Sequence, residues 1–127
     1  MRPRFLIWLT VALLLVLGFT GVASAALTDL GPGTLYRDAI EDLAARQIIS
    51  GFPDGTFRPQ DPVARQQFAK MIVGTAGYPV SESDICPFAD VETGGATTLY
   101  PDNYVAVCAA KSITAGKTPT TFDPTGR

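Results

Sequence analysis

Apolar residues recur with a helical period between Tyr36 and Arg46. They are spaced at i, i+3, i+4, i+7 and i+8, which places them on one face of an α-helix, and most charged residues of the segment lie off that face. The apolar positions are Tyr36, Ala39, Ile40, Leu43 and Ala44. The pattern predicts an amphipathic helix that buries this face and leaves its charges in water.

A turn is predicted directly after this helix, in the run GFPDGTF at residues 51–57. Proline suits the second position of a type I turn and glycine its fourth, which are the places of Pro53 and Gly55. The pair Asp61-Pro62 then combines a helix-capping residue with the proline favoured at the first helical position. We expect a second helix from Pro62 to about Thr75. Its expected inner face consists of Ala64, Phe68, Met71, Ile72 and Thr75.

The same unit begins again later in the chain. Residues 34–38 read TLYRD and residues 98–102 read TLYPD, while TFRP at 56–59 corresponds to TFDP at 121–124. The residue numbers differ by 64 in the first pair (34 and 98) and by 65 in the second (56 and 121), so we expect one inserted residue in the loop between them. The prediction is an all-α chain with one and a half helix–loop–helix repeats: repeat 1 at 26–78, a connector at 79–97 and a partial repeat 2 at 98–127. Since such units bury their apolar faces against neighbouring repeats, we also expect further repeats of the same kind as partners.

The first 25 residues have the composition of a secretory signal peptide. Two arginines precede an apolar run over residues 5–17, and residues 23–25 read ASA, which is a small-residue cleavage site. We expect cleavage after Ala25 and secretion of the rest. The alternative is an uncleaved anchor, since the uncharged stretch is long enough to span a bilayer. We expect contact with a membrane only through this segment.

Composition narrows the chemistry that the chain can perform. The 127 residues include no histidine, two cysteines, 10 basic and 12 acidic residues, with a net charge of −2. Without histidine there is no Ser–His–Asp triad and no histidine-ligated zinc, and the charge balance does not favour a nucleic-acid partner. Asp54 lacks the series of acidic ligands that a calcium loop requires. We expect a module that is not an enzyme and has no metal and no cofactor.

Cys86 and Cys108 are the two cysteines of the chain. In an exported protein an even cysteine count indicates a disulfide. Closing the loop between them would stabilise the fold by about 3–4 kcal/mol in the loop-entropy model. We therefore predict a structural Cys86–Cys108 disulfide. A reactive thiol and half of a metal site are the alternatives, and neither has supporting residues in the sequence.

Three segments of repeat 1 together resemble the S-layer homology (SLH) domain family. They are YRDAIEDL at 36–43, IISGFPDGTFRP at 48–59 and PVARQQFAK at 62–70. The family joins an aromatic-led helix, a loop of the form I-x-G-[YF]-x-D-G-x-F-x-P and a P-[VI]-T-R-A-E-F-A helix. The resemblance is strong over residues 30–76 and weaker over 86–127. It implies a helical bundle, usually of three repeats, that holds an exported bacterial protein to the cell surface or cell wall.

The resemblance also implies a ligand and a site. SLH domains bind anionic secondary cell-wall polysaccharide, and the arginine of their helix motif, here Arg65, contacts the anion. An arginine fork is well suited to a carboxylate. Gly51 allows the backbone to approach a sugar closely, and Asp54 keeps the shape of the loop. Tyr36, and in repeat 2 Tyr100, are candidate sugar contacts.

The sequence departs from the family pattern around these residues. Ala64 and Gln66-Gln67 flank Arg65 in place of threonine and alanine-glutamate, and Leu35 stands where the family has a tryptophan. These departures leave two alternatives open. One is a protein–protein or surface-lattice assembly module without a glycan site. The other is the N-terminal fragment of an exported hydrolase.

Overall fold

A computed structural model describes residues 26–95 and 97–127, and the predicted signal peptide at 1–25 lies outside these residues. Within them the chain forms three helices and no strand, which confirms the all-α prediction. The helices are α2 (Arg37–Ala45), α3 (Arg65–Ala76) and α4 (Asp102–Ala110). None of the helices in these two ranges is long and apolar enough to cross a membrane.

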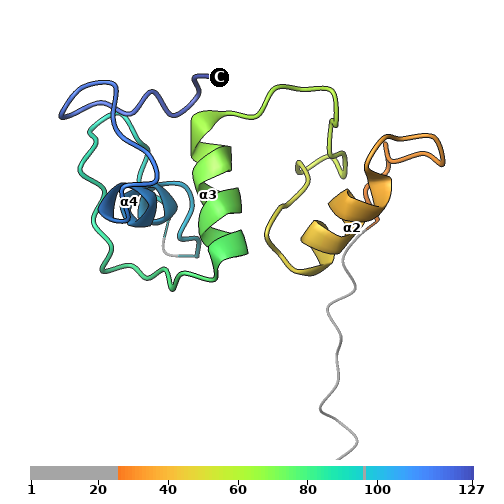
Figure 1. The fold of residues 1–127 in the computed structure, drawn as a ribbon, viewed down its shortest axis with the longest axis horizontal. Coiled ribbons are helices and arrows are strands. Elements are labelled where there is room, and N and C mark those ends of the chain that lie inside the picture. Colours follow the sequence, from red (N-terminus) through yellow and green to blue (C-terminus); the bar gives the residue numbers. More distant parts are fainter. Residues whose placement is uncertain (1–25, 96) are drawn as a thin grey trace, which may run out of the picture.

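Helix α3 stands between the two halves of the molecule, with α2 on one side and α4 on the other (Figure 1). It contacts α4 directly. The apolar cluster on the α4 side contains Ala69, Val73, Phe88, Val91, Val105, Val107, Cys108 and Phe122. The cluster on the α2 side contains Leu30, Ile40, Ile48 and Ile49, and Met71 of α3 packs against it. Helix α3 therefore contributes side chains to both cores and joins them.

The two halves repeat the same backbone hydrogen bonds. The amide of Ile48 donates to the carbonyl oxygen of Leu43, and that of Ile113 donates to that of Cys108, both at 3.0 Å. These donors differ by 65 in number (48 and 113), as do the first residues of α2 and α4 (37 and 102), whereas the turns before the helices, with donors 34 and 98, differ by 64. The internal repeat is confirmed, but the predicted place of the insertion is wrong. The extra residue precedes the helix and does not lie in the loop after it.

Helix α3 begins three residues later than the sequence predicts. Ala64 has an extended backbone, with φ −73° and ψ 150°, and its amide donates to Gln67 Oε1 at 2.8 Å. The amides of the first two helical residues donate to the carbonyl oxygens of Gly126 and Pro124 at 2.9 and 3.0 Å. These partners come from the C-terminal segment, far away in the sequence. They accept hydrogen bonds from the free amides at the start of the helix, a role that the sequence predicts for a cap at Asp61.

One aspartate fixes the loop in each half. Asp29 accepts hydrogen bonds from the amides of Phe57 and Arg58, both at 2.7 Å. Asp90 accepts them from the equivalent amides of residues 122 and 123, at 2.7 and 2.8 Å. The backbone bonds, led by those from residues 57 and 122, lower the pKa of both carboxyl groups because they favour the charged form. Asp90 lies in the predicted connector, so this segment takes part in the repeated core contacts.

Replacing Asp90 with asparagine should lower the free energy of unfolding at neutral pH, since an amide oxygen accepts both hydrogen bonds less strongly than a carboxylate. The pKa of Asp90 is lowered in the folded protein. Its contribution is therefore complete above its ordinary pKa of 3.8 and is lost as the pH falls through the folded value. We expect the stability difference between wild type and D90N to shrink below that pH, as measured by denaturant titration. A difference that grows on acidification would contradict this, and the exposed Glu82→Gln variant is the control.

The predicted Cys86–Cys108 disulfide is wrong in this structure, because both cysteines have free thiols. Their sulfur atoms have separate partners. Cys108 Sγ lies 3.8 Å from the carbonyl oxygen of Ala69 in α3, and Cys86 Sγ lies 3.9 Å from that of Phe88. Cys108 is fully buried and packs as a small apolar residue. Burial raises the pKa of both thiols.

The free thiols predict a two-stage reaction with a thiol reagent. Cys86 is half-buried and should react slowly in the folded protein, whereas Cys108 should react only after unfolding. Mass spectrometry should give the same mass before and after treatment with a reductant. A reduced form that is two hydrogens heavier would show that the disulfide forms after all.

Candidate functional site

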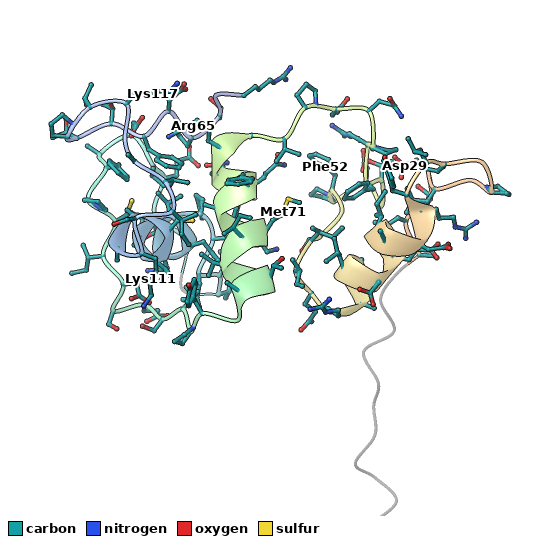
Figure 2. All side chains as sticks on the ribbon, viewed as in Figure 1. Asp29, Phe52, Arg65, Met71, Lys111 and Lys117 are labelled. Atoms are coloured by element: carbon teal, nitrogen blue, oxygen red, sulfur yellow. The ribbon has the colours of Figure 1, made fainter. Side chains whose placement is uncertain are left out.

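A groove of about 510 Å³ lies between α3 and the loop that follows α2. One wall comes from the loop, at residues 48–61. The opposite wall comes from residues 62–71, on the approach to α3 and its first turns, together with Tyr100 from the second half. Figure 2 shows Phe52 on the loop side of the groove and Met71 on the side of α3 that faces it. The groove thus joins elements of both repeats.

Asp54 holds the loop wall in shape, as the sequence predicts. The amide of Gly55 donates to the carbonyl oxygen of Phe52 at 2.9 Å and closes the predicted turn. Asp54 Oδ1 accepts the Thr56 hydroxyl at 2.6 Å and its amide at 3.0 Å, and Oδ2 accepts Arg58 Nη2 at 2.8 Å. The hydrogen bonds from Thr56, followed by those from Arg58, lower the pKa of Asp54 to about 2. The carboxylate is therefore ionised at neutral pH and committed to contacts within the loop.

Two further features shape this wall. The guanidinium of Arg58 lies 4.1 Å from the centre of the Phe52 ring, which places a cation on an aromatic face at the groove. A Cβ atom added at Gly51 would lie 2.7 Å from the carbonyl oxygen of Thr56. Since real Cβ atoms do not approach a backbone oxygen so closely, the position requires glycine. This requirement comes from a contact within the chain, and the close approach of a sugar at Gly51 stays a prediction.

Lys70 is the positive charge of the opposite wall. Its Nζ donates to Ser50 Oγ across the groove at 2.8 Å and lies 5.9 Å from the centre of the Tyr100 ring. Burial lowers the pKa of Lys70 because it removes water from the ammonium group. Among the described residues, Lys70 makes no ion pair with a carboxylate. The groove therefore contains a half-buried cation whose charge no side chain of the described chain compensates.

The sequence comparison of the two repeats pairs Tyr100 with the wrong residue of repeat 1. With the observed difference of 65, Tyr100 is the counterpart of Leu35 and not of Tyr36. Tyr100 is half-buried at the groove, and burial raises the pKa of its hydroxyl group. Its ring thus stands, in repeat 2, where the family motif has its tryptophan.

Arg65 points away from the groove toward the C-terminal segment (Figure 2). Its Nε donates to the carbonyl oxygen of Phe122 at 2.9 Å and its Nη2 to that of Ala115 at 2.8 Å. Its guanidinium carbon lies 4.4 Å from the centre of the Phe122 ring. Arg65 does not line the groove. In this structure it fastens the start of α3 to the second repeat.

Tyr36 also lies outside the groove lining. The sequence places it on the buried face of the helix, but its side chain is 73% exposed. It is the N-cap residue of α2 and has a left-handed backbone with φ 61°, so it precedes the helix and does not share its apolar face. Of the five residues predicted for the glycan site, the structure brings Gly51 and Tyr100 to the groove and Asp54 to its supporting loop, and places Arg65 and Tyr36 elsewhere.

Sequence reasoning missed Lys70 and Arg58 as residues of this site. The sequence contains a signal for Lys70. It follows Gln66, another residue of the groove, by four positions, so the two residues share a helix face. Arg58 directly follows the loop motif, but its position on Phe52 depends on the folded turn. The partner of Lys70, Ser50, comes from the other wall and is not visible as a pair in the sequence.

Comparison with known proteins places the first half of the chain. The family model described as the S-layer homology domain matches residues 27–69. An outer membrane protein SlpA from Thermus thermophilus is 43% identical over 72 residues, which is 57% of this chain and 8% of the relative. The SlpA of Deinococcus radiodurans is 45% identical over 47 residues, covering 37% and 4%. An S-layer protein of Bacillus licheniformis is 27% identical over 105 residues, covering 83% and 11%.

The chain thus spans about a tenth or less of the length of these relatives. No solved structure gives a significant match to it. The matched segment contains α2, the loop wall of the groove and the first turn of α3, and its loop has the geometry that the motif predicts. The chain therefore carries an S-layer homology domain, at residues 27–69.

Proposed function

We propose that this chain is a non-catalytic module that attaches an exported protein to the bacterial cell envelope by binding anionic cell-wall polysaccharide in the groove. The names of the relatives support a place at the envelope, since two are outer membrane proteins and one is an S-layer protein. The S-layer homology domain includes the whole loop wall of the groove. The signal peptide predicted at 1–25 fits export.

The uncompensated charge of Lys70 carries the proposal for an anionic ligand. A half-buried ammonium group favours a site that supplies a negative charge, and an acidic sugar substituent would restore the favourable environment that burial removes. The rings of Phe52 and Tyr100 offer apolar faces for the sugar itself, and Gly51 lets the ring come close to the backbone. A bound anion should therefore raise the pKa of Lys70 from its lowered value.

Arg65 has a different part in this proposal from the one that the family motif suggests. Two of its donors are used by carbonyl oxygens of the second repeat. We assign it to holding α3, and therefore Lys70, in place, and we assign direct contact with the anion to Lys70. Tyr36, exposed beside α2, remains a candidate for contact with a more distant sugar of a long polymer.

Co-sedimentation with purified cell-wall sacculi tests the proposed function. The exported chain should pellet with sacculi that retain their secondary polysaccharide and should stay in the supernatant after the polysaccharide has been stripped. Unchanged pelleting after stripping would overturn polysaccharide recognition and favour attachment to another wall component.

A further inference from the structure

Lys70 and Ser50 bring free hydrogen-bond donors together at the groove. Lys70 Nζ spends one of its three N–H groups on Ser50 Oγ at 2.8 Å, which leaves two. The Ser50 hydroxyl accepts this bond and keeps its own hydrogen for another partner. Both residues line the groove, one from each wall, and Ser50 is exposed. Three donors are therefore available to a ligand from two neighbouring points.

The uncompensated positive charge of the groove belongs to an ammonium group and not to a guanidinium. Arg58 also lines the groove, but its Nη2 donates to Asp54 Oδ2 at 2.8 Å and its Nε to Thr56 Oγ1 at 3.2 Å. Asp54 therefore compensates the charge of Arg58. The flat fork of a guanidinium matches the two oxygens of a planar carboxylate, whereas an ammonium group acts as a point charge and commonly binds phosphate. The cation at Lys70 is thus of the kind that suits phosphate.

We propose that the acidic group bound at Lys70 is a phosphodiester in the backbone of the wall polymer. The inference rests on the proposed function and names the anion, which that function leaves open. The two free N–H groups of Lys70 and the hydroxyl of Ser50 donate to the two non-bridging oxygens of the phosphate. The sugars or polyols on either side of it lie against the rings of Phe52 and Tyr100.

The arrangement of these donors favours a tetrahedral anion over a carboxylate. The N–H groups of an ammonium fan out around the nitrogen, so they do not share one plane with a hydroxyl on the opposite wall. The oxygens of a planar carboxylate accept hydrogen bonds best near their own plane. The oxygens of a phosphodiester are arranged around a tetrahedral phosphorus and accept from donors outside a single plane. A phosphodiester can therefore use all three donors, whereas a carboxylate leaves about one of them unused.

The charges of the groove favour a diester over a phosphomonoester. Lys70 supplies one uncompensated positive charge, and Asp61, which also lines the groove, would repel a second negative charge. A phosphodiester carries one negative charge, whereas a phosphomonoester carries between one and two at neutral pH. A diester also has a sugar or polyol on both sides. This suits a groove with Phe52 on one wall and Tyr100 on the other.

Titration of the isotope-labelled exported chain with two defined oligomers tests the inference. One is a synthetic glycerol phosphate oligomer, and the other is an oligogalacturonate with the same number of charges. The glycerol phosphate oligomer should shift the amide resonances of residues 48–61 and bind about fivefold more tightly than the oligogalacturonate, as for the gain of one hydrogen bond. Lys70→Gln should weaken its binding about tenfold. Lys70→Arg should remove the preference, since the guanidinium fork suits the carboxylate.

The outcomes separate this inference from the proposed function. Equal or tighter binding of the oligogalacturonate, or no saturable shift with glycerol phosphate, would overturn the phosphodiester. The proposed function is tested separately, since it fails only if pelleting with sacculi does not depend on the polysaccharide. Vesicles of phosphatidylglycerol present the same diester on a lipid surface. If the chain bound these vesicles and not the glycerol phosphate oligomer, the assignment to a polymer backbone would be wrong. An unchanged preference in Lys70→Arg would contradict the part given to the ammonium group.

Discussion

Replacing Phe122 with alanine should lower the free energy of unfolding by about 3–5 kcal/mol, the usual cost of removing a large aromatic ring from a core. The ring is fully buried and stacks on Phe88 with centroids 5.3 Å apart. It also supports the guanidinium of Arg65 at 4.4 Å. The substitution therefore removes a core contact and the platform for the contact between repeats. Urea unfolding followed by circular dichroism measures the loss.

The first repeat offers a matched control for this prediction. Phe57 is the counterpart of Phe122 and lies in the same backbone context, but it is only half-buried, and no arginine of residues 26–95 and 97–127 lies over its ring. Phe57→Ala should therefore cost clearly less than Phe122→Ala. Equal losses would contradict the expectation that Phe122, which is more deeply buried and contacts Arg65, stabilises the fold more than Phe57 does. A variant F122A that is unfolded without denaturant would support the prediction when F57A stays folded under the same conditions.

Replacing Arg65 with glutamine should lower the free energy of unfolding by about 2–3 kcal/mol, because it removes charge-assisted hydrogen bonds to two carbonyl oxygens. The arginine is half-buried and Phe122 is buried, so the oxygen of Phe122 would lose its partner without full access to water, whereas Ala115 is exposed. Arg65→Lys should recover little of the loss, since one ammonium group cannot bond to both oxygens. Hydrogen exchange should show faster opening of the C-terminal segment in both variants.

Arg46→Gln is the control for a change of charge alone. Arg46 forms an exposed ion pair with Asp42 at 3.4 Å, and such pairs contribute about 0–1 kcal/mol. If R65Q and R46Q had the same small effect, Arg65 would not be the fastening between the repeats. A large effect of R65Q on exchange near α2, with none in the C-terminal segment, would contradict the assignment as well.

The sequence predicted the features that depend on neighbouring residues. The turn at residues 52–55 follows from the places of proline and glycine. Asp54 stabilises it by accepting hydrogen bonds from residues two and four positions later. The helical segments follow from apolar periodicity, and their ends were missed by a few residues. The repeat was visible because its turn and helix start keep the same residue types.

Features that depend on contacts between the halves could not be predicted from the sequence. The expected inner face of α3 included Phe68, which is 44% exposed, and omitted Ala69 and Val73, which are fully buried. The sequence pattern predicts a single apolar stripe, whereas α3 packs against a core on each side. The same reason explains Arg65: its partners lie 50 and 57 positions later, so its helix motif alone could not separate an anion ligand from a contact between repeats.

Sedimentation of charge variants with sacculi tests most directly the proposal that the groove binds anionic polysaccharide through Lys70. Lys70→Gln should bind about tenfold more weakly or worse, as expected for the loss of a half-buried charge partner. Lys117→Gln removes the same charge from an exposed position outside the groove and should bind as the wild type does. Loss of binding in K70Q with unchanged unfolding free energy is the predicted result. Equal pelleting of K70Q, K117Q and wild type would contradict the account.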